Sequence, residues 1–180
     1  MNDNDINLAA KILFDHRLNK TGLSALPKRF QPRSIEESYN IQNQLKLFYL
    51  TAEISPFANT SHLADYSVKV PLALQELGHD IRTIIPKYGF VSERKYILRE
   101  VIRLREIPFE FDDEEVFTSA KSAFIPKTRV QVYFLENDSR FKTLSNLLYK
   151  SKNGRIIADN AERFAYFSKA SLATLPHLFW

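Results

Sequence analysis

Short apolar runs and one helical pattern alternate in the middle of this chain. An apolar run at residues 47–50 leads into a turn that carries Pro56, and a helical pattern then ends at Leu77-Gly78-His79-Asp80. A second apolar run, residues 81–85, stops at Pro86. Strand, loop, helix and strand at this spacing predict a βαβ unit. Its first loop then lies at the carboxyl edge of a parallel sheet, where open α/β sheets bind ligands.

Several short motifs follow one another in order along residues 46–180. They are Ala52-Glu53, Pro56-Phe57, Thr60, Leu63, Asp65, Pro71-Leu72-Ala73-Leu74, Leu77-Gly78-His79-Asp80, Pro86, Tyr88-Gly89, Val132-Tyr133-Phe134-Leu135-Glu136-Asn137 and Asp159-Asn160-Ala161-Glu162-Arg163-Phe164-Ala165. This series resembles the bacterial glycogen and starch synthases, whose pattern reads A-E-x-x-P-F-x-K-T-G-G-L-x-D, then A-L-P-x-A-L, L-G-H-D-V, V-Y-F-L-D-N and D-N-x-x-R-F-A.

The resemblance implies a fold and a reaction. The fold is α/β, a partial Rossmann-like, doubly wound parallel sheet that forms the first domain of a two-domain glycosyltransferase. The reaction moves glucose from ADP-glucose to the non-reducing end of an α-1,4-glucan, with retention of anomeric configuration. ADP-glucose is a donor substrate here, so no cofactor is expected, and the implied partners are a nucleotide sugar and an α-glucan.

The composition is that of a globular protein. The chain has 180 residues, 44% of them hydrophobic, including 14 phenylalanines, which is enough for one domain with a core. It has no cysteine, so disulfides, thiolate metal sites and cysteine nucleophiles are excluded. The acidic N-terminus does not resemble a signal peptide, and no apolar run reaches the roughly 20 residues that span a bilayer. We therefore expect a soluble, cytoplasmic protein with no membrane partner.

The net charge of +4 is unevenly distributed. Residues 82–105 are rich in arginine and lysine, and residues 106–115 are rich in aspartate and glutamate. A basic stretch can bind nucleic acid. Here the acidic stretch follows at once and strand-like alternation runs through both, so the pattern favours a solvated β-meander over a nucleic-acid-binding surface.

The first 45 residues lie outside the synthase pattern. Residues 6–18 have helical periodicity, and Ser34-Ile35-Glu36-Glu37 is a capping box that predicts a second helix to about Lys46. The residues Ala9-Ala10, Leu13, Leu26-Pro27, Arg33-Ser34-Ile35-Glu36-Glu37-Ser38-Tyr39 and Ile41-Gln42 resemble the N-terminus of the 2-keto-4-pentenoate hydratase family. That family's metal-binding carboxylates have no counterpart here. Residues 1–45 are thus a helical extension or the mark of a gene fusion, ahead of a domain at 46–180.

The loop from Glu53 to Asp65 is the candidate donor site. In the family, the lysine and paired glycines of K-T-G-G lie against the nucleotide-sugar phosphates, as a cation and close backbone amides would. This chain keeps Thr60 but has Asn59 in place of the lysine and Ser61-His62 in place of the glycines. His62 restores a positive charge when protonated. The alternative is structural, with Thr60 or Ser61 capping the helix that starts near Leu63.

Four further residues are candidates for substrate binding, each with a structural alternative. Glu53 faces the ligand crevice or orders the loop by a hydrogen bond. Asp65 lies beside the sugar or nucleotide, or serves as a helix-start carboxylate. Tyr88 lies at the exit of the second strand or packs at its rim. Asp159 lines a sugar pocket, or it caps the last helix through Asp159-Asn160-Ala161-Glu162.

The catalytic residues are not assigned. No metal-ligand spacing, Ser-His-Asp set or P-loop is present. In the family, a strand ending in H-x-H-D-W follows the D-N-x-x-R-F-A helix, whereas this sequence stops at Leu178-Phe179-Trp180. The resemblance therefore predicts a fragment that is inactive alone, because its catalytic histidine and the cations of the second domain are missing.

Two other functions stay open. One is a non-catalytic sugar- or nucleotide-binding protein, or one that pairs with a separate chain; the other is a hydratase-like enzyme. In a doubly wound fold the first strand is normally central. If its outer neighbour lies beyond Trp180, the strand at 47–50 forms an edge, and we expect self-association or pairing with a chain that supplies the missing strand.

Overall fold

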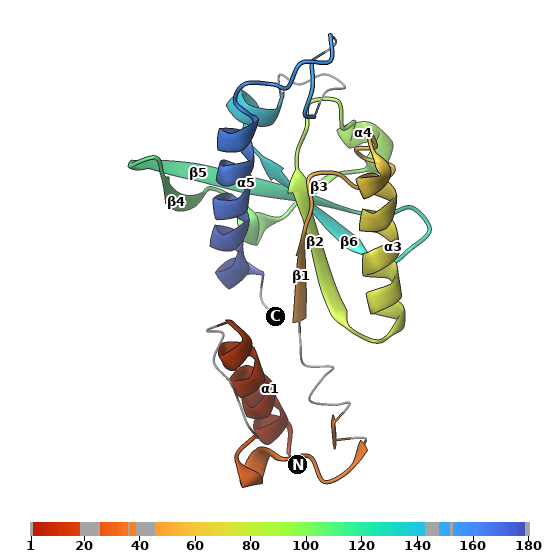
Figure 1. The fold of residues 1–180 in the computed structure, drawn as a ribbon, viewed down its shortest axis with the longest axis vertical. Coiled ribbons are helices and arrows are strands. Elements are labelled where there is room, and N and C mark those ends of the chain that lie inside the picture. Colours follow the sequence, from red (N-terminus) through yellow and green to blue (C-terminus); the bar gives the residue numbers. More distant parts are fainter. Residues whose placement is uncertain are drawn as a thin grey trace. The chain divides into compact units, whose positions relative to one another are not determined.

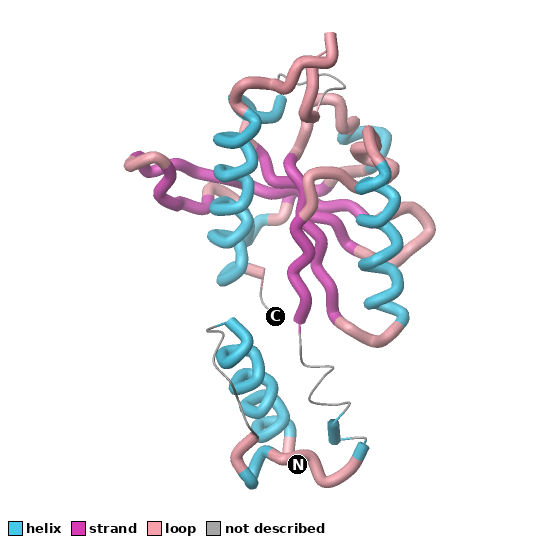
Figure 2. The backbone as a smooth tube through the Cα atoms, viewed as in Figure 1, coloured by secondary structure: helices cyan, strands magenta, loops and turns pink. Residues whose placement is uncertain are grey.

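The computed structural model describes residues 2–18, 26–35, 37–38, 46–142, 148–151 and 153–178. The chain divides into two compact units, the smaller formed by Met1–Leu47 and Leu74–Ile81, the larger by Phe48–Ala73 and Arg82–Trp180. Figure 1 shows the elements coloured along the sequence, and Figure 2 shows where helix, strand and loop alternate.

The N-terminal residues form the predicted first helix. Helix α1 spans Asp3–Leu18, and the Asp5 N–H donates to Asn2 Oδ1 at 2.8 Å, which caps the helix start. Its buried side chains, including Ile6 and Ala9, pack with Phe30 from the short 3₁₀ helix η1, Lys28–Phe30. This cluster is separate from the main core.

The predicted cap at Ser34 is also confirmed, whereas Glu37 reaches back to Arg33 and not to the cap residue. The Glu37 N–H donates to Ser34 Oγ at 3.1 Å, and Glu37 Oε2 accepts from the Arg33 N–H at 2.6 Å, one residue before the cap. The helix predicted to continue to about Lys46 lies largely outside the described residues. The domain boundary at residue 46 stays a prediction.

The predicted βαβ unit is present. Its elements are β1 (Lys46–Leu50), α3 (His62–Glu76) and β2 (Asp80–Pro86). The remaining elements are α4 (Glu93–Tyr96), β3 (Arg99–Glu100), η2 (Ile102–Leu104), β4 (Ile107–Phe111), β5 (Glu114–Phe124), β6 (Gln131–Glu136), the π-helical turn η3 (Asp138–Lys142), α5 (Asn160–Thr174) and η4 (Leu175–His177). In Figure 1, α3 and α5 flank the strands on opposite sides, which confirms the α/β fold.

The sheet is mixed, not wholly parallel. The strand order is β1-β2-β6-β5-β3, with β4 paired to β5. Strands β2 and β6 are parallel, whereas β5 runs antiparallel to both β4 and β6. The connections in this half are too short for a crossover, so only hairpins can form there. Between β4 and β5 the turn residues Asp112 and Asp113 both have positive φ, as a two-residue hairpin turn requires.

The charged stretch is thus only partly a meander. Residues 107–115 form β4 and the start of β5, an antiparallel pair that the alternation predicts. Residues 93–96 form α4 instead, because Ser92 caps a helical turn by accepting the Lys95 N–H at 3.2 Å.

Glycines define two turns that frame the βαβ unit. Gly78 has φ 88°, and the Gly78 and His79 N–H groups donate to the Gln75 and Leu74 carbonyls, a Schellman end to α3. Gly89 follows β2, where an added Cβ would lie 1.9 Å from the Lys142 carbonyl oxygen. Only glycine allows this close approach of two backbone segments.

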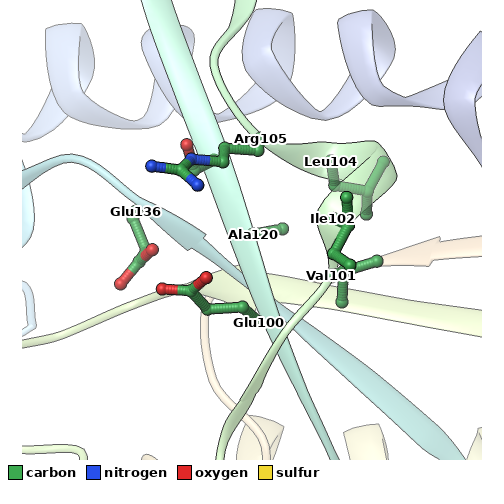
Figure 3. A pocket seen from close by; sticks show the side chains of 8 residues that line it. Glu100, Val101, Ile102, Leu104, Arg105, Ala120 and Glu136 are labelled. Atoms are coloured by element: carbon green, nitrogen blue, oxygen red, sulfur yellow. The ribbon is translucent and has the colours of Figure 1, made fainter.

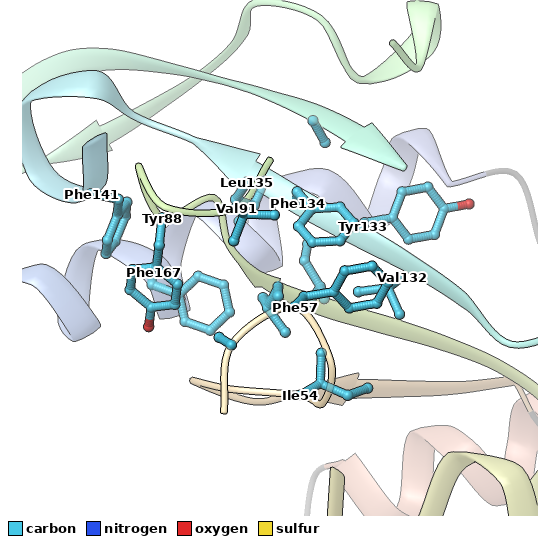
Figure 4. Close-up of a cluster of buried hydrophobic side chains, with 14 of the residues drawn as sticks. Ile54, Phe57, Tyr88, Val91, Val132, Tyr133, Phe134, Leu135, Phe141 and Phe167 are labelled. Carbon is cyan, nitrogen blue, oxygen red and sulfur yellow. The ribbon is translucent and has the colours of Figure 1, made fainter. Parts of the chain in front are cut away.

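The core of the larger unit surrounds β6, whose residues from Val132 to Leu135 are all buried (Figure 4). Phe57 reaches into this core from the loop after β1. Its ring makes edge-on contacts with Phe134 and Tyr96, with centroids 5.0 and 4.7 Å apart. The loop that carries the candidate site is therefore anchored in the sheet. No helix in the described parts of the chain is long and apolar enough to cross a membrane.

Candidate functional site at the carboxyl edge of the sheet

The Glu53 carboxylate lies at the centre of the candidate site and is fully buried. Its Oε2 accepts from the Thr60 N–H at 2.7 Å, the Thr60 hydroxyl at 2.9 Å and the Ser61 N–H at 3.2 Å. Its Oε1 accepts from the Ser61 hydroxyl. One side chain in the loop after β1 thus closes that loop onto the start of α3.

This arrangement places a carboxylate where a phosphate is expected. The amides at a helix N-terminus form an anion site. Here two amides just before α3 donate to Glu53 and are not free for another anion. Ser61 caps the helix, because its Oγ accepts the Leu63 N–H at 3.2 Å and its carbonyl accepts the Ala64 N–H at 3.1 Å. The cap expected from Thr60 or Ser61 is therefore Ser61.

Three more hydrogen bonds hold the same loop. The Ser55 N–H donates to the Ala64 carbonyl at 3.2 Å. The Tyr88 and Tyr96 hydroxyls donate to the Ala52 and Pro56 carbonyls, each at 2.8 Å. Tyr88 is fully buried, and this burial raises the pKa of its hydroxyl, with smaller contributions from neighbouring groups. Tyr88 therefore supports the loop from within the core.

The outer rim of the loop is exposed. Asn59, Thr60, Ser61, His62 and Asp65 are all open to solvent. These five are the predicted residues of this loop that a ligand can reach directly. Asn59 contributes no charge, and its Nδ2 donates to Ser55 Oγ at the long distance of 3.5 Å.

A second segment reaches Glu53 from the far end of the chain. The Tyr149 hydroxyl donates to Glu53 Oε1 at 3.3 Å, and Asn160 Nδ2 donates to the Tyr149 carbonyl at 2.7 Å. Burial, followed by the nearby Glu53 charge, raises the pKa of Tyr149. The start of α5 and the loop after β1 are therefore joined at one edge of the sheet.

Asp159 occupies the N-cap position of α5 but makes no capping hydrogen bond. The prediction that the Asp159 side chain caps α5 is therefore wrong. With φ −89° and ψ 11°, its backbone departs from the extended conformation of most caps, and its carboxylate lies 3.9 Å from Arg163 Nη1. The exposed Asp159 side chain stays a candidate for ligand binding.

Two residues of this edge, Tyr149 and Arg163, are not among the site residues that the sequence predicts. Arg163 is buried, and its Nη2 donates to the Leu148 carbonyl at 3.1 Å. Its Nε and Nη1 have no hydrogen-bond partner in the described structure, and burial lowers the pKa of its guanidinium. The arginine of D-N-x-x-R-F-A is a visible signal in the sequence, whereas Tyr149 lies in no motif.

Hydroxyl groups connect β1 to α3 beneath the loop. Ser67 Oγ on α3 lies 2.8 Å from Thr51 Oγ1 and 3.4 Å from the Tyr49 hydroxyl. Thr51 and Ser67 are buried, so these contacts satisfy polar groups that would otherwise be costly. They fix the helix against the end of β1, three residues before Glu53.

A separate recess lies over β5 and β6 (Figure 3). It is lined by Glu100, Val101, Ile102, Leu104, Arg105, Ser119, Ala120 and Glu136. The carboxylates of Glu100 and Glu136 point toward one another, with the Arg105 guanidinium near them. The recess shares no residue with the loop from Glu53 to Asp65.

An ion-pair network borders this recess. Lys121 Nζ lies 2.8 Å from Glu93 and 3.1 Å from Glu136, and Lys87 Nζ lies 2.8 Å from Glu93. Hydrogen bonds from Lys121 and then Lys87 lower the pKa of Glu93 to about 2. Through Lys87, Glu93 and Lys121 the network joins the turn after β2 to α4 and to strands β5 and β6. Its role is therefore structural.

A mixed α/β sheet, with a polar loop and a helix N-terminus at the carboxyl end of its first strand, is the arrangement of a Rossmann-like domain. Residues 46–180 match the family model described as the starch synthase catalytic domain. The chain therefore belongs to the starch synthase catalytic domain family.

Named relatives agree with this family. A glycogen synthase of Chlorobium limicola is 34% identical over 139 residues, which cover 77% of this chain and 28% of the relative. A glycogen synthase of Chlorobaculum parvum is 35% identical over 135 residues, or 75% of this chain and 28% of the relative. The chain thus spans little more than a quarter of the length of these relatives.

A solved structure has a similar fold. The catalytic domain of starch synthase IV from Arabidopsis thaliana, bound to ADP and acarbose, superposes with a TM-score of 0.60 at 25% sequence identity. The match covers 73% of this chain and 25% of that chain.

The buried carboxylate predicts a large loss of stability in Glu53→Gln. The amide keeps the shape of the side chain but sets an NH₂ group against the donors of Thr60 and Ser61. We expect the free energy of unfolding, measured by urea titration with circular dichroism, to fall by about 2–4 kcal/mol. Glu110→Gln, on the exposed face of β4, is the control. Equal midpoints for the two variants would contradict the role assigned to Glu53.

Proposed function

We propose that this chain is part of a glycosyltransferase that moves glucose from ADP-glucose to the non-reducing end of an α-1,4-glucan. The observation that carries the proposal is the family match across residues 46–180, which includes the loop and helix start at the carboxyl edge. The similar Arabidopsis domain was solved with ADP and acarbose bound, which supports a nucleotide-sugar donor and a glucan acceptor.

In this proposal the site residues have two kinds of role. Glu53 and Tyr88 hold the loop from inside, since both are fully buried. The exposed groups of Asn59, Thr60, Ser61, His62 and Asp65 face the donor, and Asp159 faces the sugar. His62, at the first residue of α3, is the side chain of this loop that can take a positive charge against a diphosphate.

A second candidate function is non-catalytic binding of a sugar or nucleotide. Two observations favour it: Asn59 lacks the charge of a lysine, and Glu53 already holds the Thr60 and Ser61 amides. Transfer of labelled glucose from ADP-glucose to glycogen separates the two functions. The chain alone is expected to transfer no glucose, so the assay adds a chain that carries the rest of the family's catalytic domain. Transfer that needs both chains supports the enzyme, and binding without transfer by the pair supports the binding protein.

The remaining parts of the proposal concern organisation. Residues 1–45 form a helical segment distinct from the domain at 46–180, and α1 with its own small core supports that division. The proposal includes a cytoplasmic location. The sequence has no cysteine and so cannot form a disulfide, which is consistent with a reducing compartment.

Strand β1 adds a protein partner to the proposal. It stands at one end of the strand order in the described structure. The Thr51 N–H donates to the Ile84 carbonyl on β2 at 3.1 Å, so by alternation the Leu50 N–H points to the opposite edge. A strand from another chain can extend the sheet there.

Restoring the family's loop chemistry predicts tighter donor binding. Asn59→Lys, Ser61→Gly and His62→Gly together return a charge and open the backbone, so ADP-glucose should bind about tenfold more tightly in calorimetry. Asn59→Gln, which adds length but no charge, is the control. If the triple variant folds and binds no better than the parent, the loop is not a donor site.

Blocking the β1 edge predicts weaker strand pairing. Leu50→Pro removes the N–H that points away from β2, and proline is tolerated on an edge strand. At tens of micromolar protein, light scattering from aggregates should be weaker for this variant than for the parent chain. A parent chain that stays monomeric at that concentration, with no partner present, would refute pairing between copies at this edge.

A further inference from the structure

Helix α3 has a row of exposed apolar side chains that the proposed function does not use. Leu63, Tyr66 and Val70 are 42%, 65% and 38% exposed, and Ala73 is also exposed. Leu77, directly after the helix, is 71% exposed. The spacing of three and four residues between neighbours is that of the a and d positions of a coiled coil.

The row is distinct from the face by which α3 packs on its own sheet. The buried residues of the helix are Ala64, Ser67 and Pro71. A surface helix normally has one apolar face and one polar face. Here a second, exposed apolar row runs along α3. In Figure 1, α3 is the yellow helix. Contiguous exposed apolar rows mark contact surfaces.

We propose that α3 pairs in antiparallel orientation with α3 of a second copy of this chain. In an antiparallel pair, a positions pack against d positions. Tyr66 then lies against Leu77 of the second copy, and Val70 lies against Ala73. Each contact occurs twice because the two-fold axis relates the two helices.

The charges beside the row fit a second copy. Lys69 and Glu76 both flank it on the same side, seven residues apart, and both are exposed. Neither takes part in an ion pair in the described structure. In the antiparallel pair Lys69 of each copy lies beside Glu76 of the other, giving two symmetric ion pairs. A parallel pair would place Lys69 beside Leu74 and leave these charges unmatched.

The size of the row sets the strength of the pairing. The helix has 15 residues, or about 22 Å of length. One helix face of this length buries well under the roughly 800 Å² per partner of a standard interface. The dimer is therefore weak, with a dissociation constant on the order of 10–100 μM.

Charge reversal tests the pairing directly. Sedimentation equilibrium of the full chain should give a dimer that Lys69→Glu and Glu76→Lys each weaken about tenfold, because each reversal sets like charges together twice. The double variant Lys69→Glu/Glu76→Lys should return to within about twofold of the parent. Lys169→Glu, on the exposed surface of α5, is the control and should change nothing.

Disulfide cross-linking tests the orientation. The sequence has no cysteine, so single cysteines can be placed without background. A mixture of Val70→Cys and Ala73→Cys chains should cross-link to each other faster than either does to itself. A monomer at about 500 μM, or a dimer whose affinity neither charge reversal alters, would overturn the proposal. A dimer that responds to Leu50→Pro and not to the reversals would place the contact at β1 instead.

Discussion

A single buried carboxylate determines the shape of the ligand edge of this domain. Glu53 accepts hydrogen bonds from Thr60, Ser61 and Tyr149, so two loops that are 96 residues apart in the sequence meet at one side chain. A buried charge without such donors would be strongly unfavourable. The path of the loop after β1, the start of α3 and the position of Tyr149 therefore depend on one another.

This constraint bears directly on the proposed donor site. The family places phosphate against a lysine and two glycines, and this chain places polar side chains there. Because Glu53 takes the Thr60 and Ser61 amides, a bound diphosphate must rely on side chains at the rim, His62 above all. The ordered loop and a bound anion thus compete for the same backbone N–H groups. Which of the two candidate functions the chain has depends on whether these N–H groups stay bonded to Glu53 or bind an anion.

The sequence predicts the parts of the fold that rest on local patterns. The βαβ unit, α1 and the Ser34 cap follow from periodicity and capping chemistry. The burial of Tyr88 and the contact between Tyr149 and Glu53 do not, because they depend on how distant segments pack. At Asp159 the motif is present without its capping hydrogen bond, since the backbone there is not extended.

The most direct test of this account is hydrogen exchange at the Thr60 and Ser61 amides. Exposed loops normally exchange fast, whereas amides bonded to a buried carboxylate open only when the surrounding structure opens. The account predicts that both amides of the parent chain are protected to a degree similar to amides of the buried strand β6. Exchange at the rate of an open loop would contradict the central role of Glu53.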